Sequence, residues 1–593
     1  MVFQKIIFLI TYLSLASNYG VGEWFKIFAN GLILDISTAG YITVTPLLIL
    51  IISIWVPLSD RAWRRIFMGY YFIVAVVASA IMSGDLGLYQ YWGFRVDSSV
   101  LFYLQSPKEA MASVTLGDAV LATVSFVVMF SAMIFTYLRC ARLIVFDRPK
   151  LLPSLVSTVG LVLCGGLVFI GIRGGLPTSV ANLSKVYFSN ESFLNHAAVN
   201  PQFSLLSTIG KEDDFTGKYK FYSDETLASN IAKLQTPPSG ETPKVLRSER
   251  PNILFIVCES FSEAILNLQI GDEWVMPRLR QLTSEGLYFP NAVANSSRTD
   301  RGIVSVLYGF PAQPRTSIIK YPAKSCKIPS LATKLLDEGY TSEFIYGGDL
   351  NFANISSMLY PTGWQSLVWQ KDLRFKGVAT GKWGYDDATM SEYVAQRIES
   401  QYDPEQPFIT TWLTLSSHEP FEVPYSKFED PKLNAMAFAD EAVGDVVDAL
   451  RGTPVWDNLL IIIVADHAYT YPYNIKYNSL QRHRIPLVWY GGAVEEPIVI
   501  DKYVTQMDIV ATLLAQMGIS HDEFEFSRNM LDSNFVERGY YTYSDGFGVV
   551  NSRGSIVYDN TSNSIISHQG DTTSLESMGK STLQRTMQVL AEY

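Results

Sequence analysis

Five apolar stretches near the start of this 593-residue chain constrain its fold more than any other feature. They cover residues 6–19, 42–56, 66–82, 120–138 and 155–172. A helix needs about 20 apolar residues to cross a bilayer, so several of these stretches are at the short end. We expect residues 1–175 to form a five-helix transmembrane domain. The first stretch also has an interpretation as a cleaved signal peptide, because Lys5 precedes its apolar core and small residues lie near Ala16.

Basic residues in two of the loops predict the orientation of these helices. One group follows the second stretch and the other follows the fourth: Arg61, Arg64 and Arg65, then Arg139, Arg142, Arg148 and Lys150. The positive-inside rule puts both loops in the cytoplasm. Everything after residue 175 is then outside, whether the first stretch is retained or cleaved. Residues 83–117 form an outward loop whose aromatic residues are typical of an interfacial helix.

The rest of the chain has the pattern of an α/β domain. Residues 176–250 show little periodicity and include a Pro-rich break at 236–243, which predicts an extracytoplasmic connector with a short helix near 225–234. From residue 251 strands and helices alternate, as in a mostly parallel sheet covered on both faces. Strands are predicted at 253–258, 342–346, 408–413, 459–464 and 486–490, and helices at 276–285, 330–338, 386–400, 435–451 and 504–517. We assign 251–530 to a catalytic domain. Strand-like segments at 539–543 and 554–558 predict a small C-terminal subdomain over 531–593.

Composition excludes some classes of protein. The formal net charge of −11 and the lack of a basic stripe argue against nucleic-acid binding. Four cysteines are too few for a disulfide scaffold, and the pairing of Cys258 and Cys326 cannot be deduced from sequence.

Three ionisable residues follow two of the predicted buried strands. Glu259 ends the first, and Asp466 and His467 end the strand at 459–464. Ligands of α/β sheets gather outside the carboxyl ends of the strands. Thr299 lies between Arg298 and Arg301, at the start of an apolar stretch with helical potential. A helix that begins there would hold a phosphate or sulfate ester at its free N–H groups and positive dipole end.

A threonine hydroxyl is a weak nucleophile at neutral pH and needs a metal or a base. Two carboxylates, an imidazole and the Thr299 alkoxide make a four-ligand site for a divalent metal such as Zn²⁺ or Mn²⁺. Each part alone also has a structural interpretation, since Asp-His pairs are common and a single Glu often caps a helix. The ordered combination at strand ends is what favours a metal site.

The order Glu259, Thr299, Asp466-His467 resembles the sulfatase-type branch of the alkaline phosphatase superfamily. Within that branch the chain most resembles the lipoteichoic acid synthases, which are membrane-anchored phosphoglycerol transferases. The resemblance covers residues 250–530 and the membrane plan. It implies a multi-span α-helical membrane domain followed by an α/β sulfatase-like domain with a mostly parallel central sheet. It also implies that one divalent metal binds Glu259, Asp466, His467 and the nucleophile Thr299. Mn²⁺ best suits three oxygen ligands and one nitrogen, while Mg²⁺ and Zn²⁺ are compatible.

Further polar residues are predicted to reach the same pocket. His418 follows a strand and resembles the family's pocket histidine, which contacts the substrate phosphate. The other predicted substrate-binding residues are Arg298, Arg301, Asp349, Trp383 and His483. The sequence favours equally a role for Trp383 in an ordinary loop that caps the following helix.

One departure from the family concerns the head group. Lipoteichoic acid synthases follow the pocket Asp with a Trp and an Arg that hold glycerol phosphate, where this chain has Asn354 and Ser356. The metal and nucleophile residues carry over, but these two contacts with the head group do not.

These features predict a membrane-anchored phosphotransferase of a bacterial cytoplasmic (inner) membrane, with its catalytic domain outside. It would move a phosphoglycerol-type group from a phospholipid donor to an envelope glycan or lipid acceptor through a phospho-threonine. His418 would act as the second catalytic residue. A phosphoethanolamine transferase is an alternative, although such enzymes usually have more cysteines in the soluble domain. A sulfatase or phosphodiesterase is another, but Thr299-Asp-Arg-Gly lacks the Cys/Ser and Pro of the sulfatase motif. A non-catalytic envelope scaffold is the third.

Overall fold

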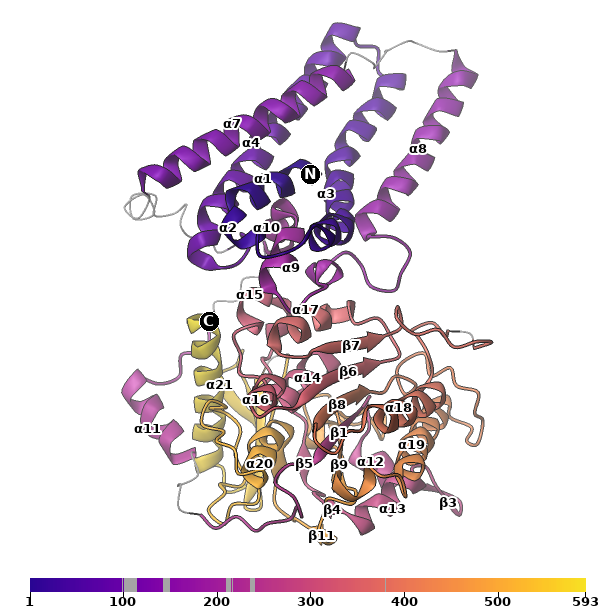
Figure 1. Cartoon of the computed structure of the whole chain (residues 1–593), viewed down its shortest axis with the longest axis vertical. Helices are drawn as coiled ribbons and strands as arrows, with labels where there is room; N and C mark the ends of the chain where they lie inside the picture. The colour runs from indigo at the N-terminus through magenta and orange to yellow at the C-terminus, as the bar shows by residue number, and fades with distance from the viewer. Residues whose placement is uncertain are drawn as a thin grey trace. The chain divides into compact units, whose positions relative to one another are not determined.

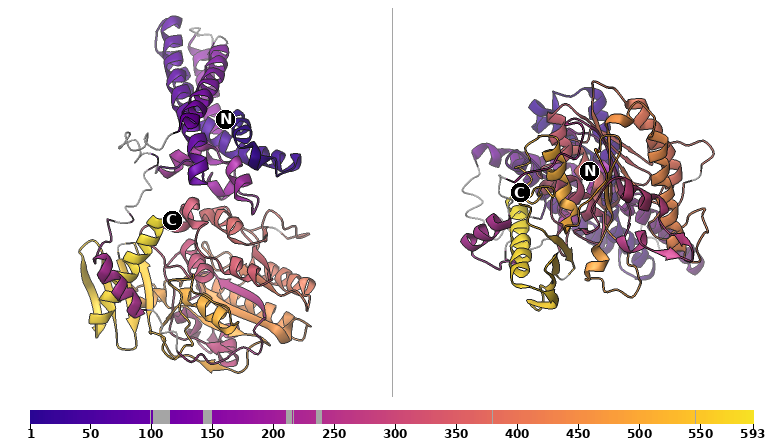
Figure 2. Two further views of the ribbon diagram at one scale, coloured as in Figure 1. Left: turned by 60° about the vertical axis from the view of Figure 1, so that its left-hand side comes forward. Right: turned by 90° about the horizontal axis from the view of Figure 1, so that it is seen from below.

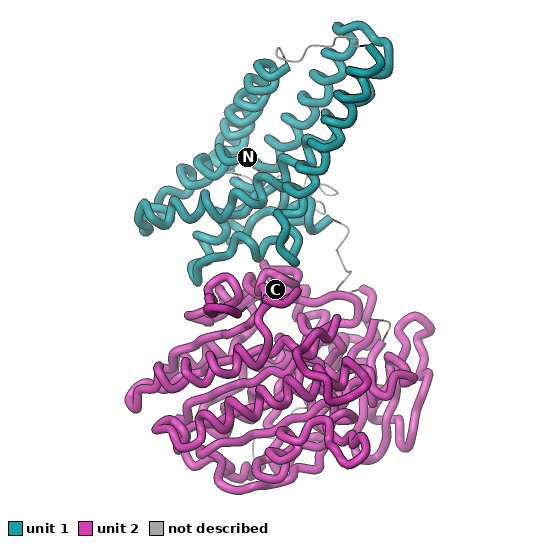
Figure 3. Tube along the Cα trace, turned by 90° about the vertical axis from the view of Figure 1, so that its right-hand side faces the viewer, with its two compact units in different colours: residues 1–213 teal, residues 214–593 magenta. Residues whose placement is uncertain are grey.

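The computed structural model describes residues 1–98, 100, 115–141, 150–209, 215, 217–234, 240–378, 380–544 and 546–593. The chain divides into two compact units, Met1–Asp213 and Asp214–Tyr593 (Figure 3). The division falls inside the predicted connector 176–250, so each unit contains part of that segment. The predicted boundaries at 175, 250 and 530 stay predictions.

The first unit contains four helices that are long and apolar enough to cross a membrane in the described part of the chain (Figure 1). These are α3 (Val21–Trp55), α4 (Asp60–Trp92), α7 (Leu116–Ala141) and α8 (Leu151–Arg173). The prediction of five spans is therefore corrected. Its first stretch is divided at Tyr12 between α1 (Val2–Thr11) and α2 (Leu13–Ala16), of 10 and 4 residues, which are too short to cross a bilayer.

The predicted loop at 83–117 is also shorter than expected. Helix α4 has no proline and continues through Gly84 and Gly87 to Trp92, where the left-handed Gly93 (φ 63°) ends it. Residues 99 and 101–114 of that loop lie outside the described residues, as do Arg142 and Arg148 of the predicted basic loop.

Part of the predicted connector packs against the long helices of the same unit. It forms η1 (Leu183–Val186), α9 (Ser192–Ala198) and α10 (Pro201–Thr208), which contact α3 or α4. Beside them lies a buried polar group, in which Lys5 Nζ is 2.5 Å from Asp35 and Asn200 donates to the same carboxylate at 2.8 Å. Buried charges need such partners because an unpaired charge is costly away from water. This group joins α1, α3 and the start of α10.

The second unit is built on an eight-stranded sheet in the order β11-β4-β10-β9-β1-β8-β6-β7 (Figure 1). The central strands β9 (Leu459–Ala465), β1 (Asn252–Cys258), β8 (Phe408–Leu413), β6 (Thr341–Tyr346) and β7 (Ser366–Trp369) are parallel. On the other side, β10 (Leu487–Tyr490) is antiparallel to β9, and β4 (Leu287–Tyr288) and β11 (Ile498–Val499) follow. The predicted mostly parallel sheet is confirmed, and β1 and β9 are continuous apolar runs because both of their faces are buried.

Helices cover both faces of this sheet. Helix α13 (Pro277–Glu285) contacts α19 (Pro431–Leu450), which also contacts α18 (Asp387–Gln401). Helix α14 (Thr299–Tyr308) contacts α16 (Leu331–Asp337) and α20 (Ile509–Gln516). Figure 1 shows these two groups on different sides of the sheet.

The last residues of the chain form a second, antiparallel sheet and a long helix. Its strands are β13 (Gly539–Tyr543), β14 (Gly546–Asn551), β15 (Gly554–Asp559) and β16 (Ser564–Gly570). Helix α21 (Thr573–Glu592) packs on β14 and β15 and beside α11 (Asp224–Leu234), as Figure 2 also shows. The sequence predicted β13, β15 and α11, but not β14, β16 and α21.

Candidate metal centre

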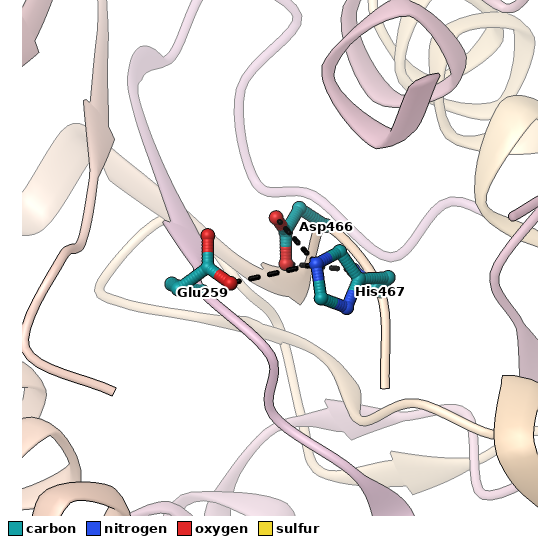
Figure 4. A group of neighbouring side chains, drawn as sticks. All are labelled: Glu259, Asp466 and His467. Atoms are coloured by element: carbon teal, nitrogen blue, oxygen red, sulfur yellow. Dashed lines mark hydrogen bonds and ion pairs between the residues drawn. The ribbon is translucent and has the colours of Figure 1, made fainter. Parts of the chain in front are cut away.

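Two adjacent parallel strands position the three predicted metal ligands. Cys258 of β1 is paired with Ala465 of β9, so Glu259 and Asp466 leave the sheet side by side at its carboxyl edge. His467 follows immediately. Figure 4 shows the three side chains pointing toward one another. One ligand atom from each lies within 4.8 Å of the others, and all three residues are buried.

The polar atoms of this group are arranged to receive a cation. His467 Nδ1 is 3.2 Å from the Ala468 carbonyl and donates its proton there, so Nε2 presents a lone pair. That Nε2 is 3.4 Å from Glu259 Oε1 and 3.6 Å from Asp466 Oδ2. Among the described residues, none donates a hydrogen bond to the buried Asp466 Oδ2. A lone pair beside two carboxylates is a donor set that fits a divalent metal.

Ser260 orients the two carboxylates. Its backbone has the left-handed conformation, φ 61°, which is uncommon for a residue with a side chain. In this conformation the Ser260 N–H donates to Asp466 Oδ1 at 2.9 Å, and its hydroxyl donates to Glu259 Oε1 at 2.6 Å. The strained backbone of Ser260 therefore places its N–H and its hydroxyl where they orient both carboxylates.

Burial and charge set the protonation of the group. Burial, together with the neighbouring Glu259 carboxylate, raises the pKa of Asp466 well above its usual value. Burial lowers the pKa of His467, which keeps the imidazole neutral. Burial also acts to raise the pKa of Glu259, but the electrostatic effect of His467 and His418 in their protonated forms, with hydrogen bonds from Ser260 and Thr299, lowers it overall. A neutral imidazole and two crowded carboxylates suit a bound cation, which would neutralise their charge.

The predicted nucleophile lies directly against this group. Helix α14 begins at Thr299, as expected, and the Thr299 hydroxyl donates to Glu259 Oε2 at 3.0 Å. Gly302 allows this approach, because a Cβ there would lie only 2.2 Å from the Asp466 carbonyl oxygen. The first turn of α14 thus rests on the end of β9.

His418 and Trp383 form the next part of the site. His418 follows β8, the other neighbour of β1, and lies close enough to Glu259 to affect the pKa of that carboxylate. Its Nδ1 is 2.8 Å from the Glu419 carbonyl, so Nε2 is the atom left for a substrate. The rings of Trp383 and His418 are 4.6 Å apart, and Phe352 is 5.3 Å from Trp383. Trp383 is thus an aromatic wall beside His418.

Asp349 lies in the turn after β6, where its Oδ1 accepts the Asn351 N–H at 2.9 Å. A bridge between Gly348 and Gly384 joins this turn to the segment of Trp383. At the two departing positions, Asn354 is left-handed (φ 66°) and Ser356 donates to the Asn351 side chain at 3.1 Å. Asn354 and Ser356 thus take part in the local turn structure.

The structure does not bring every predicted residue to the centre. Arg301 is buried and bonds Thr316 O at 2.9 Å and Ser296 Oγ at 3.2 Å, and Arg298 is an exposed cap of α14. His483 is fully buried and stacks on Tyr541 with ring centroids 4.0 Å apart. Among the described hydrogen bonds and ion pairs, Arg298, Arg301 and His483 have none with the three ligands. Their substrate-binding roles stay predictions.

Arg482 is the residue that the sequence did not single out. It lies in η6 (Leu480–His483), and its charge interacts with Asp466 and Glu259. Burial lowers the pKa of this guanidinium, and its buried Nη1 has no hydrogen-bond partner among the described residues. The available signal was a basic residue just before the strand that pairs with β9, but the neighbouring His483 is the more familiar site residue.

Two solved structures share this fold, and the first is described as a protein of the alkaline phosphatase superfamily. A superfamily member from Vibrio parahaemolyticus has a TM-score of 0.54 at 22% identity, covering 63% of this chain and 97% of that one. The lipoteichoic acid synthase LtaP from Listeria monocytogenes has a TM-score of 0.53 at 16% identity, covering 63% and 98%. Both likenesses establish the fold.

Residues 251–519 match the model of the sulfatase family. Phosphoglycerol transferase I from Xanthomonas campestris pv. campestris (strain B100) is 25% identical over 319 residues, 50% of this chain and 44% of the relative. The lipoteichoic acid synthase of Staphylococcus saprophyticus is 23% identical over 410 residues, 60% of this chain and 57% of the relative. The chain thus spans about half the length of these curated relatives. These relatives are distant, and their names are those of a phosphoglycerol transferase and a lipoteichoic acid synthase.

Proposed function

We propose that this protein is a membrane-anchored, metal-dependent phosphotransferase. It moves a phosphoglycerol-type head group from a phospholipid to an envelope glycan or lipid through a phospho-threonine. The observation that carries this proposal is the Thr299 hydroxyl, which lies 3.0 Å from Glu259 at the start of α14 and beside the three clustered ligands. The named relatives support transfer over hydrolysis.

Glu259, Asp466 and His467 would hold the metal, with Thr299 as the fourth ligand. Bound there, a divalent metal lowers the pKa of the Thr299 hydroxyl and polarises the phosphoryl oxygen. We propose Mn²⁺ because most of the ligand atoms are oxygens.

In the first step Thr299, ionised to its alkoxide, attacks the phosphorus of the lipid phosphodiester through Oγ1, and it is released as the alkoxide in the second step. The new Oγ1–P bond replaces the P–O bond to diacylglycerol, whose oxygen takes a proton from His418 Nε2. In the second step a hydroxyl of the acceptor attacks the same phosphorus, His418 takes its proton, and Thr299 leaves. The N–H groups at the start of α14 and the Arg482 guanidinium would stabilise the negative charge of the transferring group.

Phosphoethanolamine is the second candidate head group. The Asp349 carboxylate follows β6 in the turn that a backbone bridge joins to the Trp383 segment, and Phe352 packs on Trp383. A carboxylate and aromatic rings suit an ammonium group, and Ser356 supplies no cation where the family has an arginine.

The test is the intact mass of the full-length protein after incubation in bilayers that contain phosphatidylglycerol or phosphatidylethanolamine. We expect an added phosphoglycerol in the first bilayer, which Thr299→Ala abolishes and the exposed Thr561→Ala retains. An adduct from phosphatidylethanolamine alone would favour the second candidate. No adduct and no metal-dependent turnover of either lipid would contradict both.

A further inference from the structure

The first unit contains an open cavity of about 850 Å³, and its lining residues Val77, Phe169 and Leu206 are 52%, 64% and 57% exposed. It lies among α3, α4, α8 and α10, and each helix contributes apolar walls, such as Ile42, Val77, Phe169 and Leu206. Its volume falls within the range of about 300–1,000 Å³ that is typical of small-molecule sites. Three of its four helices are candidate membrane spans, so its apolar walls would have direct access to lipid chains.

Gln202 places a hydrogen-bond acceptor without a donor in the wall of this cavity. It lines the cavity, is only 3% exposed, and donates through Nε2 to the Ala78 carbonyl at 2.8 Å. Its Oε1 is buried and accepts no hydrogen bond from any described residue. A buried acceptor without a donor costs free energy, so this oxygen needs a donor from whatever occupies the cavity.

Arg173 gives the cavity a charge. It is the one charged residue among the described residues that line the cavity, and it ends α8. Its described hydrogen bonds go to the carbonyls of Gly175, Pro177 and Thr178. Three bonds leave two of the five guanidinium N–H groups for another acceptor. No carboxylate neutralises Arg173 among the described ion pairs. Its position at a helix end is where a lipid head group meets the interface.

We propose that this cavity is a binding site for an anionic diacyl phospholipid. The acyl chains lie among α3, α4, α8 and α10, the phosphodiester pairs with Arg173, and a hydroxyl of the lipid donates to Gln202 Oε1. This site lies wholly within the first unit and goes beyond the proposed transfer, because binding requires no chemistry.

The test measures lipid bound to the delipidated full-length protein by native mass spectrometry. Thr299→Ala is present in every sample, so that turnover plays no part. The probes are phosphatidylglycerol and diacylglycerol with the same acyl chains. Arg173→Gln tests the charge, with Arg139→Gln at the exposed end of α7 as its control. Val77→Trp fills the cavity, and Val124→Trp, 55% exposed on α7 and outside the lining, is its control.

We expect one tightly bound phosphatidylglycerol and a Kd about tenfold weaker for diacylglycerol, the scale of one charged hydrogen bond. Arg173→Gln should remove this difference, Val77→Trp should weaken both lipids, and the controls should change neither. If Val77→Trp fails to fold, Leu206→Trp fills the cavity from α10. Equal binding of both lipids, or equal loss in control and test variants, would overturn the proposal. Because the readout is bound lipid and not turnover, neither result depends on whether the transferase mechanism is correct.

Discussion

Gly302 and Ser260 adjoin the reacting groups at the level of single residues, and neither takes part in the chemistry. Gly302 brings the start of α14 against the Asp466 backbone, and the left-handed Ser260 fixes both carboxylates. Both residues act by setting how closely the groups of the site approach one another, and a sequence pattern alone does not reveal such distances.

Gly302→Ala should disable transfer while preserving the fold. The added methyl would meet the Asp466 carbonyl oxygen at 2.2 Å, so α14 must shift and move Thr299 away from Glu259. A displacement of about 1 Å at a reacting group costs about 100-fold in rate. The measurement is head-group release from labelled phospholipid. Gly160→Ala in α8, which meets nothing within 4 Å, is the control and should retain the wild-type rate. A wild-type rate for Gly302→Ala would show that this contact is not needed.

Arg482→Gln should separate metal binding from catalysis. Removing a cation near Asp466 and Glu259 strengthens binding of a divalent metal, while loss of the guanidinium lowers kcat by about 100-fold. Calorimetry with Mn²⁺ and lipid-turnover kinetics measure the two effects, and Arg482→Lys should restore part of the rate. Arg484→Gln is the matched control, since Arg484 bonds Pro290 O and the Asn291 side chain instead. Weaker metal binding in Arg482→Gln would contradict this role.

Among the secondary-structure elements, the start of α18 holds the loop that carries His418. The buried Asp387 carboxylate accepts the N–H groups of Leu415 and Ser416, both at 2.8 Å. Asp440 in α19 makes the same kind of contact elsewhere, accepting the N–H groups of Arg278 and Leu279 at 2.9 and 2.8 Å. One helix thus supports the site and the other supports α13.

Asp387→Ala and Asp440→Ala should both destabilise the protein, but only the first should slow transfer beyond its effect on folding. Each leaves two backbone N–H groups without an acceptor, at a cost of about 1–3 kcal/mol per group. Thermal unfolding gives the stability, and lipid turnover well below the unfolding temperature gives the rate. Equal rates in the two variants would show that Asp387 does not position His418.

The same two carboxylates predict how stability changes with pH. Burial raises the pKa of Asp387 and of Asp440 to about 7, above an unfolded value of about 3.9. The folded state therefore binds more protons between about pH 4 and 7, and the unfolding free energy falls as pH rises through that window. Asp440→Asn cannot titrate, so its decline from pH 5 to 7 should be shallower than that of the wild type. Identical slopes in denaturant unfolding would contradict the shift.

For the molecule as a whole, four spans give the same side for the catalytic domain as the predicted five. Arg61, Arg64 and Arg65 lie in the first turns of α4. The positive-inside rule predicts that this end of α4, like the predicted basic segment after α7, faces the cytoplasm. We therefore expect everything after α8 to be outside. The correction changes only the predicted side of the N-terminus, which moves outside.

Cysteine labelling tests this orientation. In a variant whose four cysteines are replaced by alanine, Leu58→Cys lies in the loop before α4 and Ser562→Cys in the exposed turn between β15 and β16. We expect an impermeant maleimide to label Ser562→Cys in intact spheroplasts and Leu58→Cys only after lysis. The reverse pattern would place the catalytic domain in the cytoplasm and contradict a donor in the outer leaflet.

The sequence by itself determined the strands that end in Glu259 and Asp466-His467, and the helix that begins at Thr299. Buried parallel strands are continuous apolar runs, and their carboxyl ends share one edge, so local pattern was enough to bring these residues together. It also determined most of the spans, because apolar length is a local property.

Only the tertiary structure decided which neighbouring side chains reach that edge. In η6 the His483 carbonyl accepts the Ala294 N–H at 2.8 Å, and this long-range pairing buries His483 while the Arg482 charge acts on the ligands. Arg301 likewise bonds Thr316, although its spacing from Thr299 had suggested a phosphate contact. The cavity in the first unit depends on α8 and α10 packing against α3 and α4, which are distant from them in sequence. The physical reason is the same in each case, because the direction of a side chain is set by the segments packed against it and not by its own neighbours in the chain.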